Sequence, residues 1–142
     1  TTDWRNQCGG KGGSMTGRAP GDRVARGRAG EEVAALHLSW RGYTILARNQ
    51  RTPMGELDLI CRAGRQIVVV EVKARGSDRY GDALEAVDPR KTARIRAAAV
   101  CWLADKGLFP CQVRFDAVVV GLNRDGLPCT LEHIRDLFGE GA

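Results

Sequence analysis

Helical patterns mark two segments of the chain. Residues 24–40 are dense in alanine, leucine and glutamate and end shortly before Gly42, which predicts a first helix. A second helix begins at Asp88-Pro89, because aspartate is a good N-cap and proline suits the first helical position. It ends before Gly107, which supplies the C-terminal stop.

Apolar and β-branched runs predict four strands around these helices. Three lie between the helices and one follows the second helix, at residues 43–48, 56–62, 66–74 and 113–121. Apolar spacing over 131–138 suits a short C-terminal helix, with the start of a strand as the alternative. The order α-β-β-β-α-β predicts an α/β fold in which helices flank a mixed sheet.

One domain accounts for most of the 142 residues. Residues 1–22 are rich in glycine and poor in large apolar side chains, which predicts a flexible basic N-terminal tail before a domain over residues 23–142. No apolar run is long enough to span a membrane. Five cysteines without a CxxC pair indicate reduced thiols, so we expect a cytoplasmic protein.

Charged residues lie inside two of the apolar runs. Asp58 falls within residues 56–60, and Glu71 and Lys73 end the run that begins at Ile67. Buried charges are costly unless they are paired or bound to a metal. The pattern therefore marks a candidate site.

A two-residue Gly-Arg turn at 64–65 would fix how these two strands face each other. Glycine at the first position suits a type II′ hairpin turn, and cross-strand partners then have residue numbers that sum to 129. Asp58 would lie opposite Glu71. Glu56 would lie opposite Lys73, and the alternation of side chains would put all four on one face. A longer loop would make the pairing diagonal, but the two acids would still lie on neighbouring strands.

Two opposed carboxylates repel each other, because their Cβ atoms would be only ~5 Å apart. A divalent cation between Asp58 and Glu71 removes that penalty, and oxygen ligands favour Mg²⁺ or Mn²⁺. The sequence therefore predicts a cation site on this hairpin.

A structural cluster of ion pairs is the alternative. In it Glu56 pairs with Lys73, and Asp58 pairs with Arg75 or Arg114. A structural pair is more easily built from opposite charges that face each other than from two adjacent acids, and this favours the cation.

The other face of the hairpin is also apolar. It carries side chains of two neighbouring strands: Leu57, Leu59, Cys61, Val68, Val70 and Val72. Helices are therefore expected to cover both faces of the sheet. Trp40 and Trp102 are expected to anchor the core at the helix ends.

Basic side chains gather after the third strand and at the start of the second helix. Arg75 and Arg79 follow the candidate site in a loop, and Arg90, Lys91 and Arg94 lie on the helix. Contacts from such residues to phosphates give affinity that depends on salt and little on base sequence. The net charge of +5 also favours a polyanionic partner, although charge alone does not decide this.

Several short motifs, in their order along the chain, resemble one small bacterial family. They are Arg28-Ala29-Gly30-Glu31, Arg41-Gly42-Tyr43-Thr44-Ile45-Leu46, Gly55-Glu56-Leu57-Asp58-Leu59-Ile60, Glu71-Val72-Lys73-Ala74-Arg75 and Arg114-Phe115-Asp116. Aspartate followed by Glu-x-Lys on a hairpin resembles the PD-(D/E)xK nuclease superfamily. The wider set, over about residues 24–138, resembles the uncharacterised YraN-like family, whose fold is similar to archaeal-type Holliday-junction resolvases.

This resemblance implies a restriction-endonuclease-like core and a metal-dependent active site. Asp58 and Glu71 would be ligands for Mg²⁺ or Mn²⁺, and Lys73 would orient or activate the attacking water. Glu31 matches the acidic residue that completes such sites. The chain departs from the superfamily pattern at one position, because Leu57 stands where the proline is expected.

The implied function is a metal-dependent endonuclease that hydrolyses phosphodiester bonds in structured DNA, as a Holliday-junction resolvase does. The alternative is a nucleic-acid-binding or assembly protein that retains the nuclease fold without turnover. The analogy also implies a homodimer, since a junction with two-fold symmetry needs two active sites.

Overall fold

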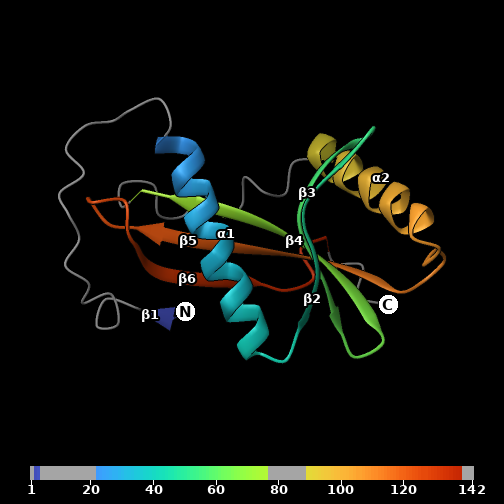
Figure 1. Ribbon diagram of the computed structural model, residues 1–142, viewed down its shortest axis with the longest axis horizontal. Helices are drawn as coiled ribbons and strands as arrows, with labels where there is room; N and C mark the ends of the chain where they lie inside the picture. The colour runs from blue at the N-terminus through green and yellow to red at the C-terminus, as the bar shows by residue number, and fades with distance from the viewer. Residues whose placement is uncertain (1, 4–21, 77–88, 139–142) are drawn as a thin grey trace.

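A computed structural model of the chain describes residues 2–3, 22–76 and 89–138. These ranges hold two helices and six strands, which lie in one layered arrangement (Figure 1). In chain order the elements are β1 (Thr2–Asp3), α1 (Asp22–Trp40), β2 (Thr44–Thr52), β3 (Gly55–Ala63), β4 (Gln66–Arg75), α2 (Pro89–Asp105), β5 (Val113–Leu122) and β6 (Pro128–Ile134).

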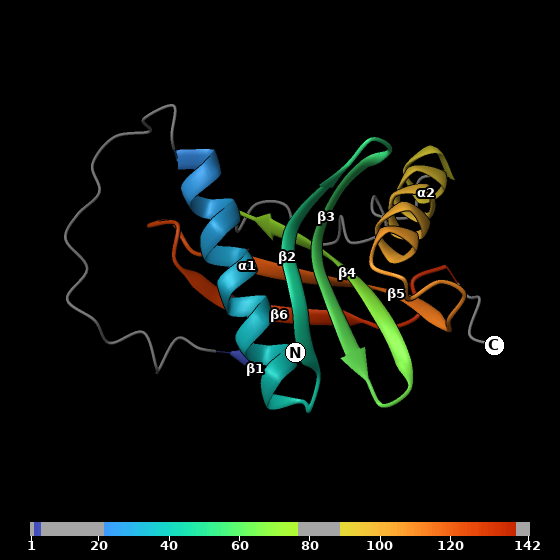
Figure 2. The ribbon, with the colours of Figure 1, turned by 45° about the vertical axis from the view of Figure 1, so that its right-hand side comes forward.

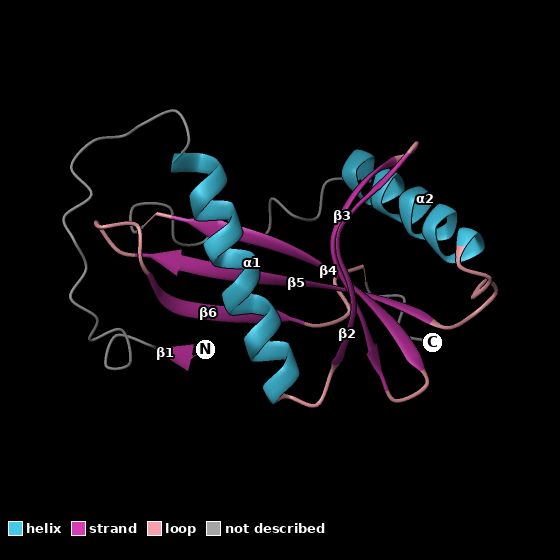
Figure 3. Cartoon of the chain, in the orientation of Figure 1, coloured by secondary structure: helices cyan, strands magenta, loops and turns pink. Residues whose placement is uncertain are grey.

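All six strands belong to one sheet with the order β1-β6-β5-β4-β3-β2 (Figure 3). The central neighbours β4 and β5 are parallel, and every other pair is antiparallel. A parallel pair needs a long crossover connection, and α2 lies in the segment that joins β4 to β5. The predicted mixed sheet flanked by helices is confirmed.

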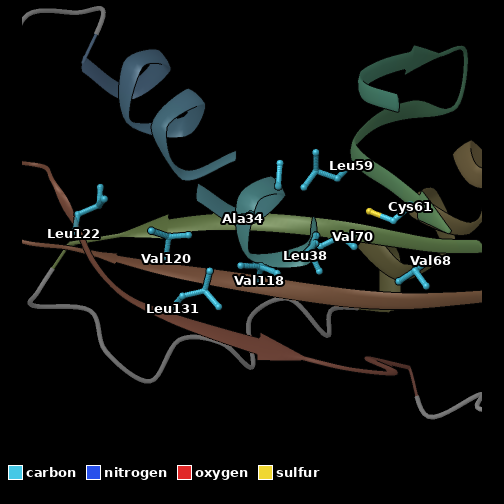
Figure 4. Close-up of a cluster of buried hydrophobic side chains, with 11 residues drawn as sticks. Ala34, Leu38, Leu59, Cys61, Val68, Val70, Val118, Val120, Leu122 and Leu131 are labelled. Carbon is cyan, nitrogen blue, oxygen red and sulfur yellow. The ribbon is translucent and has the colours of Figure 1, made fainter. Parts of the chain in front are cut away.

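The two helices cover opposite faces of the sheet, as both apolar faces of the central hairpin predicted. On the α1 face, buried side chains from the helix and from β3 to β6 form one core layer (Figure 4): Ala34, Ala35, Leu38, Leu59, Cys61, Val68, Val70, Val118, Val120, Leu122 and Leu131. On the other face, α2 packs on a second layer: Leu57, Ile60, Ile67, Val69, Ala98, Ala99, Trp102 and Leu103. Each large apolar side chain buried in this way contributes about 1.5–3 kcal/mol.

Gly30 lets α1 approach β4 closely. A Cβ atom at this position would lie 3.2 Å from the Cβ of Ala74 and 3.8 Å from Cγ1 of Val72. Real Cβ contacts are rarely that short, so a larger residue would push the helix away from the strand. The residue that follows Gly30 is Glu31, which is thereby held near the central strand.

Two elements differ from the prediction. The first strand does not end at Asn49 but continues to Thr52, because Asn49 adopts a left-handed conformation (φ 49°) that asparagine tolerates. The predicted short helix over 131–138 is wrong: residues up to Ile134 belong to β6, which pairs with the otherwise free edge of β5. The spacing of apolar residues fitted a helix, but an unpaired strand edge offered the backbone better hydrogen bonding.

Side-chain placement differs at two further positions. Leu57 packs with the α2 layer, not with Leu59 on the α1 face. Trp102 is a core residue, as predicted, but Trp40 is 87% exposed at the end of α1.

Parts of the predicted organisation fall outside the described residues. They include most of the predicted tail, although Thr2 and Asp3 pair with β6 as β1. Asp88, the predicted N-cap of α2, is also outside them, whereas Gly107 has the positive φ (69°) of a helix C-terminal stop. No helix in the described part of the chain is both long and apolar enough to cross a membrane.

Candidate functional site

The central hairpin has the predicted register over its first half. Ala63 pairs with Gln66 and Leu59 pairs with Val70, so that partner numbers sum to 129. Gly64 has a φ of 63°, the positive value that a two-residue hairpin turn needs at its first position. The paired ladder ends at Leu59 and Val70.

Beyond that pair, β3 separates from β4. Asn49, with its positive φ, lies on β2 between the partners of Leu57 and Leu59, and the β2–β3 hairpin curves toward α2 there (Figures 1 and 2). Its tip reaches the helix, because a Cβ atom on Gly55 would lie 3.7 Å from Cγ of Arg94. We call the point of separation, formed by Asp58, Glu71 and Val72, the β3–β4 fork.

Asp58 is therefore not directly opposite Glu71, and that prediction is wrong. The two acids do lie on the neighbouring strands β3 and β4, as predicted for either loop length. Oδ2 of Asp58 accepts a hydrogen bond from the backbone N–H of Val72 at 2.9 Å. The carboxylate thus takes the place of a backbone carbonyl that a continued ladder would supply.

The surroundings of Asp58 oppose its ionisation. Burial is the main cause that raises the pKa of this carboxyl to about 6, and the negative charges of Glu31 and Glu71 add to it. The Val72 N–H and Lys73 act in the opposite direction without cancelling the shift. A cation placed here would remove the cost of the ionised form.

The two carboxylate oxygens of Glu71 differ in their polar contacts. Its Oε1 accepts from Lys91 Nζ at 2.6 Å and from Lys73 Nζ at 3.0 Å. Its Oε2 is buried and has no hydrogen-bond partner among the described residues. An unpaired buried carboxylate oxygen costs free energy unless a further group binds it.

A cavity of about 380 Å³ opens at the fork. Strand β4 forms its floor, the tip of the β2–β3 hairpin one wall and α2 the other. Its lining residues are Gly55, Glu56, Leu57, Asp58, Val69, Val70, Glu71, Val72, Lys73, Lys91, Arg94 and Ile95. Acidic and basic side chains thus meet on an apolar support that lowers the local dielectric.

Lys73 pairs with its strand neighbour Glu71, while Glu56 stays exposed. The predicted alternative in which Glu56 pairs with Lys73 is wrong, because the ladder ends before these two residues could face each other. Burial and the adjacent ammonium of Lys91 lower the pKa of Lys73.

Glu31 lies on α1, outside the cavity lining, but close enough for its charge to raise the pKa of Asp58. Across the ranges 22–76 and 89–138, no three His, Cys, Asp or Glu side chains form a group that could hold a metal ion. Two carboxylates still fit Mg²⁺, which often binds through one or two of them and keeps several waters. The orphaned Oε2 of Glu71 beside Asp58 is the observation that supports this fit.

Of the residues predicted to contact phosphate, some line the cavity and others do not. Arg94 and Lys91 line the cavity, and Lys91 contacts Glu71 directly. Arg90 is exposed at the start of α2, and Arg75 is half-buried at the end of β4. Arg79 lies outside the described residues.

Lys91 was predicted to contact the DNA backbone, and its contact with Glu71 was not predicted. A signal was available in the topology. Since α2 follows β4 and leads back to the start of β5, its first turn is expected near the end of β4 that carries Glu71 and Lys73.

The carboxylate of Asp116 is fully buried on the α1 face, and both of its oxygens are paired. Arg114 donates to both of its oxygens, from Nε at 2.8 Å and from Nη2 at 2.9 Å. His133 Nε2 donates at 2.8 Å and the backbone N–H of Asp136 at 2.9 Å. Arg114 Nη2 also donates to the Tyr43 hydroxyl at 2.5 Å.

This cluster accounts for Arg114 and excludes it as a partner of Asp58. Although burial works against ionisation, the hydrogen bonds from His133, Arg114 and Asp136 lower the pKa of Asp116 to about 2. A carboxylate held in this way is a structural element that ties β5 to β6 and to the end of α1.

The fold and the site define a mixed α/β protein with a charged cavity where two strands separate. The model of "Uncharacterised protein family UPF0102" matches residues 30–120, and the chain belongs to this family. It is 50% identical to a UPF0102 protein of Frankia alni over 114 residues, which cover 80% of this chain and 94% of the relative. A UPF0102 protein of Acidothermus cellulolyticus is 44% identical over 126 residues, 82% of this chain and 95% of that protein. A UPF0102 protein of Moorella thermoacetica is 41% identical over 116 residues, which cover 82% of this chain and 97% of that protein. The resemblance to the YraN-like family is confirmed, whereas the resemblance to the nuclease superfamily stays a prediction.

Proposed function

We propose that this protein is a divalent-metal-dependent endonuclease that cleaves structured DNA, with a restriction-endonuclease-like core. The observation that carries the proposal is the buried Oε2 of Glu71 near Asp58, which has no hydrogen-bond partner in the described part of the chain and lies in a cavity that also holds Lys73, Lys91 and Arg94. Acidic residues for a cation and basic residues for a phosphate are the two requirements of metal-assisted phosphodiester hydrolysis.

Asp58 and Glu71 would hold Mg²⁺ or Mn²⁺, and Glu31 would add negative charge from α1. When bound, the cation supplies a Lewis acid and lowers the pKa of water. Lys73, fixed by Glu71 at 3.0 Å, stabilises the negative charge that develops on the phosphate. Apolar lining residues such as Leu57 and Ile95 limit the water around these charges, which strengthens their effect.

Cleavage assays test the proposal. Purified protein is incubated with junction, flap, nicked and single-stranded DNA in the presence of Mg²⁺ or Mn²⁺. We expect wild-type protein and the surface variant Lys106→Gln to cleave at least one branched substrate, and Asp58→Ala to lose activity by at least about a hundredfold. Cleavage that survives Asp58→Ala would show that another enzyme is responsible and would refute the proposal.

A second candidate function is nucleic-acid binding without turnover. One observation favours it: Lys73 and Lys91 already balance the charge of Glu71 without a cation. This function predicts DNA binding by the wild-type protein, unchanged by Mg²⁺, with no cleavage of any substrate in the panel.

A further inference from the structure

Lys91 contacts Glu71 from a separate element, α2. Its Nζ lies 2.6 Å from Oε1 of Glu71, closer than the 3.0 Å of Lys73 Nζ. Both ammonium groups therefore share one carboxylate oxygen. Two like charges gathered on one atom are stable only while the anion remains between them.

The two lysines differ in how freely they can move away from Glu71. Lys73 is two residues from Glu71 on the same strand and on the same face, so the backbone keeps the pair together. Lys91 lies on the first turn of α2, so no strand backbone ties it to Glu71, and its side chain is about as exposed as that of Lys73 (34% against 29%). Its four-carbon stem allows the ammonium to move toward an anion in the cavity without any movement of the helix.

A divalent cation and Lys91 compete for the same acid. The positive charge at Oε1 repels a cation that approaches Oε2 of the same carboxylate. A phosphate that enters the cavity offers Lys91 another anion, and Arg94 on the same helix lines the same wall. Once the Lys91 ammonium pairs with the phosphate, it no longer neutralises Glu71. The negative charge of that carboxylate is then available to the cation.

We propose that Lys91 is an internal counter-ion, which holds Glu71 in the absence of nucleic acid and moves to a backbone phosphate when nucleic acid binds. Cation binding and nucleic-acid binding then strengthen each other by the same factor, as linkage requires. This inference rests on the proposed function, since it needs the cation at Asp58 and Glu71. It adds that Lys91 weakens cation binding until a phosphate enters the cavity.

Calorimetric titration with MnCl₂ tests the inference on the full chain without nucleic acid. We expect Lys91→Gln to bind Mn²⁺ more tightly than wild type by on the order of tenfold, within the usual range for coupled sites. Lys91→Arg keeps the charge and is expected to bind as wild type does. Lys106→Gln removes a charge just beyond the end of α2 and is the matched control, expected to stay within about twofold of wild type.

The same titration is then repeated with a phosphorothioate oligothymidylate, which resists hydrolysis. Wild-type affinity for Mn²⁺ is expected to rise toward that of Lys91→Gln, and the affinity of the variant to change much less. Should Lys91→Gln fail to fold, as judged by circular dichroism, Lys91→Met takes its place.

The outcomes separate the two proposals. If wild type binds Mn²⁺ but the variant binds it no more tightly, the cation site stands and the role of Lys91 is overturned. If neither protein binds Mn²⁺, with or without the oligonucleotide, the cation site of the proposed function fails and the role of Lys91 fails with it.

Discussion

Asp58 and Asp116 are both aspartates in apolar strands, but the protein surrounds them in opposite ways. Asp116 accepts hydrogen bonds on both oxygens from Arg114, His133 and a backbone amide, and its pKa is lowered to about 2. Among the described residues, Asp58 accepts one hydrogen bond, from a backbone amide, and lies near two further acids; its pKa is raised to about 6.

The difference separates a carboxylate that stabilises the fold from one that we propose binds a ligand. A buried carboxylate with a full set of donors stabilises the fold in its ionised form. A buried carboxylate with too few donors destabilises the fold at neutral pH, and such sites are often where a ligand or substrate binds. The Asp116 cluster and the β3–β4 fork therefore make contrasting predictions, which four experiments can test.

The largest effect is expected at Asp116. Asp116→Asn leaves Arg114 buried without its counter-ion, and breaking a buried pair in this way costs about 3–5 kcal/mol. Urea unfolding monitored by circular dichroism measures the loss. Asp105→Asn, an exposed change at the end of α2, is the matched control and is expected to stay within about 0.5 kcal/mol. A loss below about 1 kcal/mol for Asp116→Asn would contradict the assignment of a structural cluster.

The pH dependence of stability is expected to differ between the two carboxylates. Because the pKa of Asp58 is raised in the folded state, its ionisation destabilises the fold above pH 6, and this penalty disappears as the pH falls toward 4. At neutral pH this penalty amounts to at most about 3 kcal/mol. The contribution of Asp116 has the opposite sign and is lost only as the pH falls from about 4 toward 2.

His37 also makes the stability of the fold depend on pH. Burial and the charge of His133 lower the pKa of His37, so the fold loses stability there on acidification. The difference between wild type and Asp58→Asn isolates Asp58, and it is expected to shrink from pH 7 to pH 4 in metal-free buffer. A difference that does not change with pH would show that Asp58 has an ordinary pKa.

A smaller gain in stability is expected from Asp58→Asn itself at neutral pH. The amide oxygen can still accept from the Val72 N–H, while the penalty for a buried negative charge is removed. We expect the free energy of unfolding to rise by about 1–2 kcal/mol in metal-free buffer. A variant less stable than wild type would indicate that Asp58 has a stabilising partner in the free protein.

The smallest effect is expected at Glu56, which is exposed and does not pair with Lys73. Glu56→Gln should change stability by less than about 0.5 kcal/mol. Glu71→Gln removes the shared partner of both lysines and should cost clearly more under the same conditions. Equal losses for the two variants would restore the ion-pair alternative in which Glu56 and Lys73 are partners.

Most of the sheet could be predicted because its signals are local. The glycine turn at 64–65 fixed the register of β3 against β4, and the apolar runs on both faces required helices on both sides. The fork could not be predicted in the same way. It depends on the left-handed backbone of Asn49 and on the contact of Gly55 with α2, which are tertiary features that override strand periodicity.

The candidate site was predicted in its residues but only partly in its pairing. Strand alternation correctly placed Glu71 and Lys73 on one face, yet Leu57 changed faces where β3 leaves the ladder. The role of Lys91 depends on how α2 crosses the end of β4, so no local pattern could reveal it. Asp116 was noted next to Arg114, but its partner His133 comes from β6, a segment with a predicted helical spacing.

Thermal unfolding in the presence and absence of Mg²⁺ tests most directly whether the β3–β4 fork is a cation site. A ligand that binds only the folded state raises the free energy of unfolding by about 2.7 kcal/mol when its concentration is a hundred times its dissociation constant. We expect a rise in melting temperature for wild type that saturates with Mg²⁺, retained in Asp105→Asn and absent in Asp58→Asn. No rise in wild type, or an equal rise in Asp58→Asn, would contradict the central claim that Asp58 and Glu71 form a cation site.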